Sequence, residues 1–373
     1  MALVEFLYCI MKLKKLYVAA TSQHVGKTTS TLGLAASFLK AGINTGYCKP
    51  VGQKHVDIGD SVVDKDAVLF ADLLKLDIHP EVHSPVILGK GSTSLYLDNP
   101  DKYDLESKII VAKEALEKTH DAVIYEGTGH PGVGSVADIS NARVAQLLEA
   151  PVVMIVEGGI GSTIDKLNMS MGLFREHNVP IVGVIVNKVI PSKMEMVRNY
   201  VGKWLVKNDL ELLGVVPYDN TLAYPLIWTI SNAIGGSFEY SKEKGFNKVE
   251  KILAGSLVNT DELSESNDSL LVVSSRVLDI SLSRVKDLSK NDHCPLCGIV
   301  VTGDDEISEG SIDYITQHNL PVIRTQLDTY GVVIKISKLE VKINRRTPWK
   351  IAKAIELIQD NVNIEHMIKH LSS

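Results

Sequence analysis

Apolar residues in the first half of the chain follow two alternating patterns. Short apolar runs with the length of buried strands occur at 15–20, 45–51, 121–127, 151–159, 180–188 and 212–217. Between them lie stretches in which apolar residues recur at helical spacing, among them 27–39 and 106–118. Strands that alternate with helices are typical of βαβ units. The pattern therefore predicts an α/β fold with a parallel sheet flanked by helices.

The second half of the chain has a different pattern. Residues 235–270 show little periodicity apart from a strand or helix near 249–257. Apolar runs then occur at 270–275, 297–303 and 320–326, with polar stretches of helical character between them. This arrangement predicts a second, smaller α/β domain.

The end of the chain is expected to be helical. Between 348 and 362, apolar residues recur at helical spacing at Ile351, Ala354, Ile355 and Ile358. The expected organisation is an N-terminal extension at 1–13, a first domain at 14–218, a second at 219–345 and a C-terminal helix at 346–373.

Length, charge and cysteine usage narrow the classes of protein. A chain of 373 residues exceeds the ~250 residues at which single cores stop growing, so two domains are expected. The formal net charge is −6 and like charges form no blocks, which argues against a nucleic-acid partner. No apolar run reaches the ~20 residues of a membrane span, so no membrane partner is expected. The four cysteines form no disulfide framework, which favours a cytoplasmic location.

Two smaller features of the sequence are expected to have no chemical role. Cys294 and Cys297 form a CxxC pair ahead of an apolar run, but no second ligand pair has the spacing of a zinc site. A pair in the core or in a turn is therefore favoured over a metal or redox site. At the other end of the chain, the basic residues at 12–15 follow the apolar opening, whereas a signal peptide has them in front. Residues 1–10 are expected to be a dispensable extension.

The segment Thr21–Thr29 is the strongest chemical signal in the chain. It reads TSQHVGKTT, follows a predicted strand and begins a predicted helix, which is the context of a P-loop. Thr21 stands where the usual first glycine would be. Backbone N–H groups at such a helix start bind phosphate, and the helix dipole favours its negative charge. The residues expected to bind ATP here are Gln23, His24, Val25, Gly26, Lys27, Thr28 and Thr29.

Several motifs resemble those of dethiobiotin synthetases and occur in the same order. They are ATSQHVGKTT at 20–29, Lys-Pro-Val at 49–51, KDAV around Asp66, Glu-Gly-Thr-Gly at 126–129, Asn187 in VIVNKV, and GVVP at 214–217. The resemblance implies the fold of that family, an ATP site with Mg²⁺, and a homodimer in which His130 lies near the partner's site.

The resemblance places a metal shell beside the P-loop, and residue chemistry supports it. Mg²⁺ prefers a few oxygen ligands and keeps some of its water. The expected ligands are therefore Thr28, Asp66 and Glu126. Three other aspartates of the same region are rivals of Asp66, namely Asp57, Asp60 and Asp64.

Two further residues are expected to contact the nucleotide. Lys49, at a strand end, would act together with Lys27 as a catalytic cation on the transferred phosphate. Asn187 would pair with the adenine edge through its amide donor and acceptor, with a strand-capping role as the alternative.

The residues around the expected substrate depart from the dethiobiotin synthetase pattern. Gln53 replaces a serine that follows Lys-Pro-Val in that family, and Lys54 and His55 lie beside it. His130 and Pro131 follow the Glu-Gly-Thr-Gly loop. Because these changes alter the hydrogen-bonding groups around the substrate, they argue against biotin synthesis.

The second half resembles the DRTGG domain at 274–281, 300–308 and 320–330, although the naming motif is poorly kept. A dethiobiotin-synthetase-like domain followed by a DRTGG-like domain resembles the N-terminal regulatory half of long bacterial phosphotransacetylases. Cobyrinic acid diamide synthases share the ATP domain, but their glutaminase domain has no counterpart in this sequence.

Two functions are consistent with these features. The first is a nucleotide-responsive regulatory ATPase related to the phosphotransacetylase half. The alternative is an ATP-dependent ligase that phosphorylates a carboxylate or carbamate before an amine attacks it. In both cases the partners are ATP and a small-molecule substrate or effector of unspecified identity.

Overall fold

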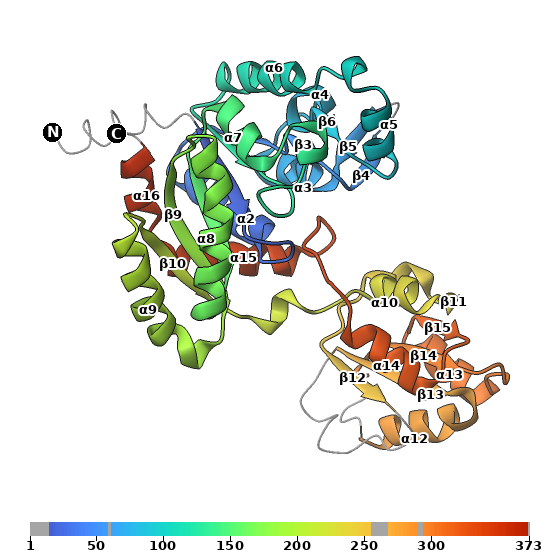
Figure 1. Ribbon diagram of the computed structural model, residues 1–373. Coiled ribbons are helices and arrows are strands. Elements are labelled where there is room, and N and C mark those ends of the chain that lie inside the picture. The colour runs from blue at the N-terminus through green and yellow to red at the C-terminus, as the bar shows by residue number, and fades with distance from the viewer. Residues whose placement is uncertain (1–14, 59–60, 255–267, 289–293, 372–373) are drawn as a thin grey trace. The chain divides into compact units, whose positions relative to one another are not determined.

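The computed structural model describes residues 15–58, 61–254, 268–288 and 294–371 (Figure 1). The expected N-terminal extension and the rival ligand Asp60 lie outside the described residues. The chain divides into two compact units. One comprises the chain up to Asp219 together with the part from Ile343 onward, and the other runs from Asn220 to Lys342.

The first unit is built on a parallel sheet of six strands in the order β10-β9-β8-β1-β7-β2. The strands are β1 (Lys15–Ala20), β2 (Thr45–Cys48), β7 (Ala122–Glu126), β8 (Val152–Glu157), β9 (Ile181–Val189) and β10 (Leu212–Pro217). The predicted parallel α/β fold is confirmed. Each of these strands lies within or next to an apolar run of the sequence.

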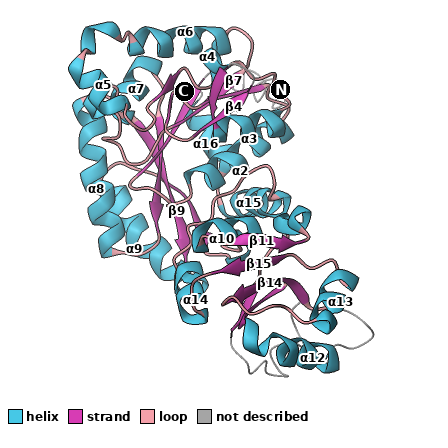
Figure 2. Ribbon diagram, turned by 90° about the vertical axis from the view of Figure 1, so that its right-hand side faces the viewer, coloured by secondary structure: helices cyan, strands magenta, loops and turns pink. Residues whose placement is uncertain are grey.

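Helices cover both faces of this sheet, as Figure 2 shows with strands in magenta and helices in cyan. One layer contains α6 (Leu105–Glu117), α7 (Asn141–Leu148), α8 (Gly161–Glu176) and α9 (Met194–Lys207). The other contains α3 (Lys65–Leu74), α2 (Lys27–Lys40), α15 (Pro348–Asn361) and α16 (Ile364–Leu371). A parallel sheet covered on both faces is apolar at successive positions. This explains why β1 is buried at every residue after Lys15.

The predicted strand at 45–51 is interrupted at its centre. It ends at Cys48, and Val51–Gly52 form a separate short strand, β3, that pairs with β6 (Val86–Ile87). Pro50 has no N–H to donate to a sheet, which accounts for the break. Lys49 therefore lies at the carboxyl end of β2 and not within a strand. Beyond β3, the strands β4 (His55–Ile58) and β5 (Ser61–Asp64) pair in antiparallel fashion.

The C-terminal segment belongs to the first unit. Helix α15 packs along α2, the helix that follows the P-loop, and also contacts β10. Beyond it, Val362 bridges to Gly214 and the Asn363 N–H donates to the Leu213 carbonyl at 2.8 Å. The predicted helix at 348–362 is confirmed as α15. Its buried residues are Lys350, Ala354, Leu357 and Ile358.

The second unit contains a sheet of five strands in the order β11-β15-β14-β13-β12. These are β11 (Ser237–Tyr240), β12 (Lys251–Ala254), β13 (Ser269–Ser274), β14 (Leu296–Thr302) and β15 (Val322–Thr325). All neighbours are parallel except β11, which is antiparallel to β15. The second, smaller α/β domain is confirmed, and the segment near 249–257 contains a strand. β11 was not predicted, because it is a short edge strand with no buried residue.

The helices of the second unit pack on separate sides of its sheet. Apolar residues of α10 (Ile227–Ile234) and α14 (Thr329–Ser337) form one core with the sheet. Those of α12 (Leu278–Leu288) and α13 (Glu309–Gln317) form the other. Short elements complete the described chain: α4 (Pro80–His83), α5 (Ser92–Asp98), and 3₁₀ turns at 100–102, 135–137, 191–193, 220–222, 242–246 and 275–277.

The packing of α15 on α2 yields a test with a matched pair of glycines. A Cβ added at Gly33 in α2 would lie 2.2 Å from Cβ of Ile358, whereas one added at Gly172 in α8 would meet no atom within 4 Å. We expect Gly33→Ala to destabilise the protein by about 1–3 kcal/mol through overpacking. Gly172→Ala should stabilise it by about 1 kcal/mol through helix propensity. Urea unfolding of both variants provides the measurement, and equal stabilisation by both would contradict this packing.

Candidate nucleotide site

The P-loop joins β1 to α2 at the carboxyl edge of the sheet. Gly26 precedes the helix with φ of 99°, a left-handed conformation that favours glycine. A Cβ at this position would also lie 2.0 Å from Nδ2 of Asn187. His24 has a left-handed backbone as well, with φ of 61°. The loop therefore has the strained, closely packed backbone that lets its N–H groups approach a phosphate.

Lys27 and Thr28 begin α2 and face the strand next to β1. Lys27 is 9% exposed, and its ammonium donates to the Gly129 carbonyl at 2.7 Å. The Thr28 hydroxyl donates to Oε1 of Glu126 at 3.1 Å. β7, which ends at Glu126, is the neighbour of β1 in the sheet, so the two loops meet at one edge.

Lys49 lies between the two predicted metal-binding carboxylates. Its ammonium is 2.5 Å from Oδ2 of Asp66 and 2.9 Å from Oε1 of Glu126. Glu126 is fully buried and Lys49 is 5% exposed. The structure thus brings together Thr28, Lys49, Asp66 and Glu126, which come from four different segments of the chain.

The electrostatics of this cluster depend on the charge of Lys49. Burial opposes that charge, but the attraction of Asp66, Glu126 and Asp64 outweighs it and leaves the pKa of Lys49 raised above its ordinary value. Burial also raises the pKa of Asp64, and the nearby Lys49 opposes this rise. The ammonium is therefore a permanent cation at neutral pH.

The rival aspartates have different surroundings from Asp66. Asp64 caps α3: its side chain accepts from the N–H groups of Asp66 at 2.9 Å and Gln53 at 3.2 Å. Asp57 is exposed on β4. Among the described residues Asp57, Asp64 and Asp66, it is Asp66 that forms the ion pair with Lys49 at hydrogen-bond distance.

Asn187 contacts the P-loop itself. Its amide Nδ2 donates to the Val25 carbonyl at 2.9 Å, and the neighbouring Lys188 ammonium donates to the His24 carbonyl. Successive strand residues normally point to opposite faces. Lys188 has a left-handed backbone with φ of 57°, which allows both side chains to reach the same loop. Sequence reasoning placed Asn187 beside the nucleotide but did not anticipate this contact.

The residues expected near the substrate lie on the surface. Gln53, Lys54, His55 and His130 are exposed, whereas Pro131 is buried. Two residues that sequence reasoning missed contact the site from within the protein. The Tyr47 hydroxyl lies 3.5 Å from Oε2 of Glu126, and Asn141 binds the loop after β7. Tyr47 lies in the predicted strand at 45–51, and Asn141 lies in a stretch for which no element was predicted. Neither belongs to a motif whose spacing would have indicated a role.

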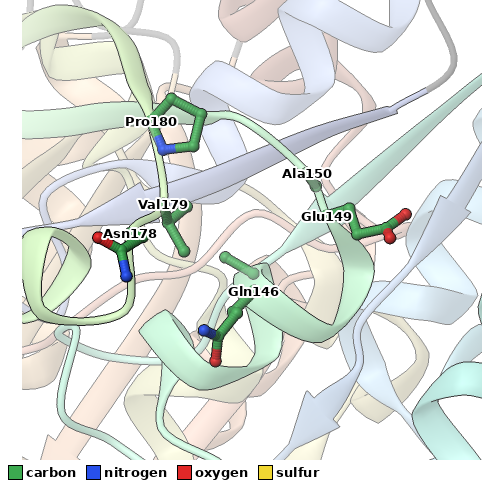
Figure 3. A pocket seen from close by; sticks show the side chains of 7 residues that line it. Gln146, Glu149, Ala150, Asn178, Val179 and Pro180 are labelled. Atoms are coloured by element: carbon green, nitrogen blue, oxygen red, sulfur yellow. The ribbon is translucent and has the colours of Figure 1, made fainter.

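A small cleft of about 250 Å³ lies at the opposite edge of the sheet, before the first residues of β8 and β9 (Figure 3). It is lined by Ala145, Gln146, Glu149, Ala150, Asn178, Val179 and Pro180. The Glu149 carboxylate pairs with Lys113 and Lys15, which lower its pKa to about 2. Its acidic group is thus already paired, and the cleft contains none of the predicted site residues.

Two kinds of feature are absent from the described residues. No group of three or more His, Cys, Asp or Glu residues among them could hold a metal ion. No helix in the same part of the chain is long and apolar enough to cross a membrane.

The two cysteines of the CxxC pair form no disulfide. Cys297 is buried, and the Cys294 sulfur lies 3.3 Å from the Tyr314 hydroxyl.

Comparison with known proteins identifies the first unit. A family model, AAA_26, described as "AAA domain", matches residues 14–225. The phosphate acetyltransferase of Pseudomonas putida is 24% identical over 368 residues, covering 93% of this chain and 50% of that protein. That of Deinococcus radiodurans is 23% identical, covering 94% and 50%. The chain therefore spans about half the length of these curated relatives.

Two other kinds of protein match only part of the chain. The cobyric acid synthase of Carboxydothermus hydrogenoformans is 27% identical over 227 residues, covering 55% of this chain and 45% of that protein. Among solved structures, the cell division protein MinD of Aquifex aeolicus has 14% identity and a TM-score of 0.36, covering 56% of this chain and 84% of that one.

The Lys49 cluster predicts a large loss of stability on removal of its cation. Lys49→Met leaves Glu126 buried without its partner, so we expect a loss of about 3–5 kcal/mol in the free energy of unfolding. The control is Lys113→Met, because Lys113 pairs with Glu149 at 2.8 Å but the Glu149 side chain is 72% exposed. That variant should lose at most about 1 kcal/mol.

Urea unfolding at neutral pH compares these variants. The double variant Lys49→Met/Glu126→Gln should recover part of the loss, because the buried charge is removed together with its partner. Similar small losses in the two single variants would contradict a buried cation at this position.

Proposed function

Because the chain belongs to the AAA_26 family of AAA domains, we propose that it binds Mg-ATP at the P-loop and acts as a nucleotide-responsive regulatory ATPase. In this proposal the chain is related to the N-terminal regulatory half of long bacterial phosphate acetyltransferases. The observation that carries it is the extent of the match: phosphate acetyltransferases align with 93% of the chain, including the second unit.

The P-loop geometry supports the nucleotide part of the proposal. The backbone from Gln23 to Thr29 would surround the phosphates, and the Lys27 ammonium would neutralise their charge. Asn187 would pair with the adenine edge through its amide oxygen and its second N–H, since the first N–H donates to the Val25 carbonyl.

The residues present fit a magnesium ion. The carboxylates of Asp66 and Glu126 contact the Lys49 ammonium, so this place already accommodates a cation. The Thr28 hydroxyl lies beside it and donates to Glu126. Such a donor set leaves room for the waters that Mg²⁺ retains. A bound Mg²⁺ would neutralise phosphate charge. Lys49 would then be a mobile cation available to a transferred phosphate, while Asp66 and Glu126 hold the metal.

A ligase is the second candidate, and the same cluster favours it. A purely binding module needs no buried lysine beside the metal ligands, whereas phosphoryl transfer benefits from an extra cation at the phosphate. The matches to cobyric acid synthases cover 55% to 56% of the chain, less than the phosphate acetyltransferases cover. ATP turnover separates the two proposals: a regulatory ATPase turns over ATP without a second substrate, whereas a ligase requires a carboxylate or carbamate and an amine.

We further propose a cytoplasmic location. Cys48, Cys294 and Cys297 are free thiols, which persist in a reducing compartment. The resemblance of the second unit to DRTGG domains also remains a proposal, and it would supply the site of a small-molecule effector.

Nucleotide binding should depend on Mg²⁺ and on Lys27. Lys27→Ala removes a charge-assisted contact to phosphate worth about 1.5–3 kcal/mol, so affinity should fall roughly 10- to 150-fold. Calorimetric titration with a non-hydrolysable ATP analogue, with and without Mg²⁺, measures this. Lys166→Ala, a substitution on α8, serves as the control. Unchanged affinity in the Lys27 variant would rule out the P-loop as the binding site.

We expect a homodimer, with His130 near the partner's site. His130 is exposed, and the loop that carries it is rich in glycine, which permits close approach of another chain. Light scattering of the full chain gives the mass in solution, and His130→Glu should shift the equilibrium toward monomer. The full chain is the appropriate material, because residues 343–371 pack on the first unit. A monomer at micromolar concentration would refute the expectation.

A further inference from the structure

Asn141 is a buried polar residue whose hydrogen-bonding capacity is completely used. It is the first residue of α7 and is 4% exposed. Its Oδ1 accepts from the Tyr17 hydroxyl at 2.7 Å and from the Thr128 N–H at 2.9 Å. Its Nδ2 donates to the carbonyls of Thr128 at 2.7 Å and His130 at 2.6 Å. An amide has two donors and accepts twice at its oxygen, so all of its groups are satisfied.

The partners fix the orientation of this amide. The Thr128 N–H can only donate, so the atom that faces it must be the amide oxygen. The two carbonyls can only accept, so they must face the amide nitrogen. Burial raises the pKa of Tyr17, which keeps its hydroxyl protonated as a donor. A Cβ at Gly127 would lie 2.6 Å from Oδ1 of Asn141, so glycine at this position permits the contact.

These bonds hold the backbone on both sides of Gly129. The carbonyls of Thr128 and His130 turn toward Asn141, whereas the Gly129 carbonyl accepts from the Lys27 ammonium at 2.7 Å. Gly129 has φ of 64°, and a Cβ there would lie 2.6 Å from Cγ2 of Val133. The alternating direction of the three carbonyls thus depends on a left-handed glycine and on one amide side chain.

We propose that Asn141 is a positioning residue for Lys27: it fixes the Gly129 carbonyl that holds the phosphate-binding ammonium at the mouth of the P-loop. The inference rests on the proposed function in one respect, that Lys27 binds the phosphates of a nucleotide. Asn141 itself would not touch the nucleotide. It acts by keeping a long, flexible side chain in one place before binding, which reduces the entropy lost when the phosphate arrives.

A double-mutant cycle in nucleotide affinity tests this role. Asn141→Asp keeps an oxygen toward Tyr17 and Thr128 but turns a second oxygen toward two carbonyls. With Lys27 present, it should weaken binding of a fluorescent ATP analogue roughly tenfold. In the Lys27→Ala background, the same change should have less than about a twofold effect, because the positioned group is gone. Asn141→Ala replaces Asn141→Asp if the latter does not fold.

The matched control is Val144→Ala, which removes buried packing from the same helix but no side-chain hydrogen bond to the loop, since valine has no polar side-chain atom. It should lower the midpoint of unfolding but leave nucleotide affinity unchanged. Equal effects of Asn141→Asp in the two backgrounds, or an equal loss of affinity in Val144→Ala, would overturn the inference alone. Failure of the wild-type chain to bind the analogue would overturn the proposed function and the inference with it.

Discussion

The ion pairs of Lys49 with Asp66 and Glu126 are the interaction on which the site depends. Glu126 has no exposed surface, and a carboxylate in that position is stable only with a cation and hydrogen bonds. Lys49 supplies the cation at 2.9 Å and Thr28 a hydrogen bond at 3.1 Å. Since these groups come from the ends of β2 and β7 and from the start of α2, one buried charge fixes the mutual position of three segments. A metal ion bound by Asp66 and Glu126 would have to replace the positive charge that Lys49 provides.

The sheet order explains why these segments meet. β1 lies between β8 and β7, and β2 lies on the far side of β7, so the loops after β1, β7 and β2 follow one another along the carboxyl edge. Ligand sites of open parallel sheets form at this edge. On the opposite side of the P-loop, β9 contributes Asn187 and Lys188 to the loop backbone. The phosphate loop is thus bounded by groups from both halves of the sheet.

The sequence was sufficient to predict most strands of the two large sheets and the strand–helix context of the P-loop, because apolar runs and a glycine-lysine-threonine motif are local signals. The short strands β3, β4, β5, β6 and β11 were not predicted separately. The predicted parallel fold of the first unit and the predicted smaller second unit are both confirmed. The apolar run at 45–51 did not reveal that the segment breaks at Pro50 into two strands of different sheets. Proline lacks the N–H that a continuous strand would donate, which is consistent with the break. Asn141 and the P-loop contact of Asn187 were not foreseen, since their partners are backbone groups brought near only by the fold.

The segment from Ile343 onward returns to the first unit, and this path of the chain is relevant to the proposed response to nucleotide. The second unit is inserted between β10, which ends at Pro217, and α15, which begins at Pro348. α15 packs on α2, and Gly33 of α2 leaves no space for a side chain against Ile358. α2 in turn begins with Lys27 and Thr28. The chain that leaves the second unit therefore continues directly into a helix packed on α2. If the protein responds to nucleotide as proposed above, this packed pair of helices is a contiguous element through which a change at Lys27 and Thr28 could reach the end of the second unit.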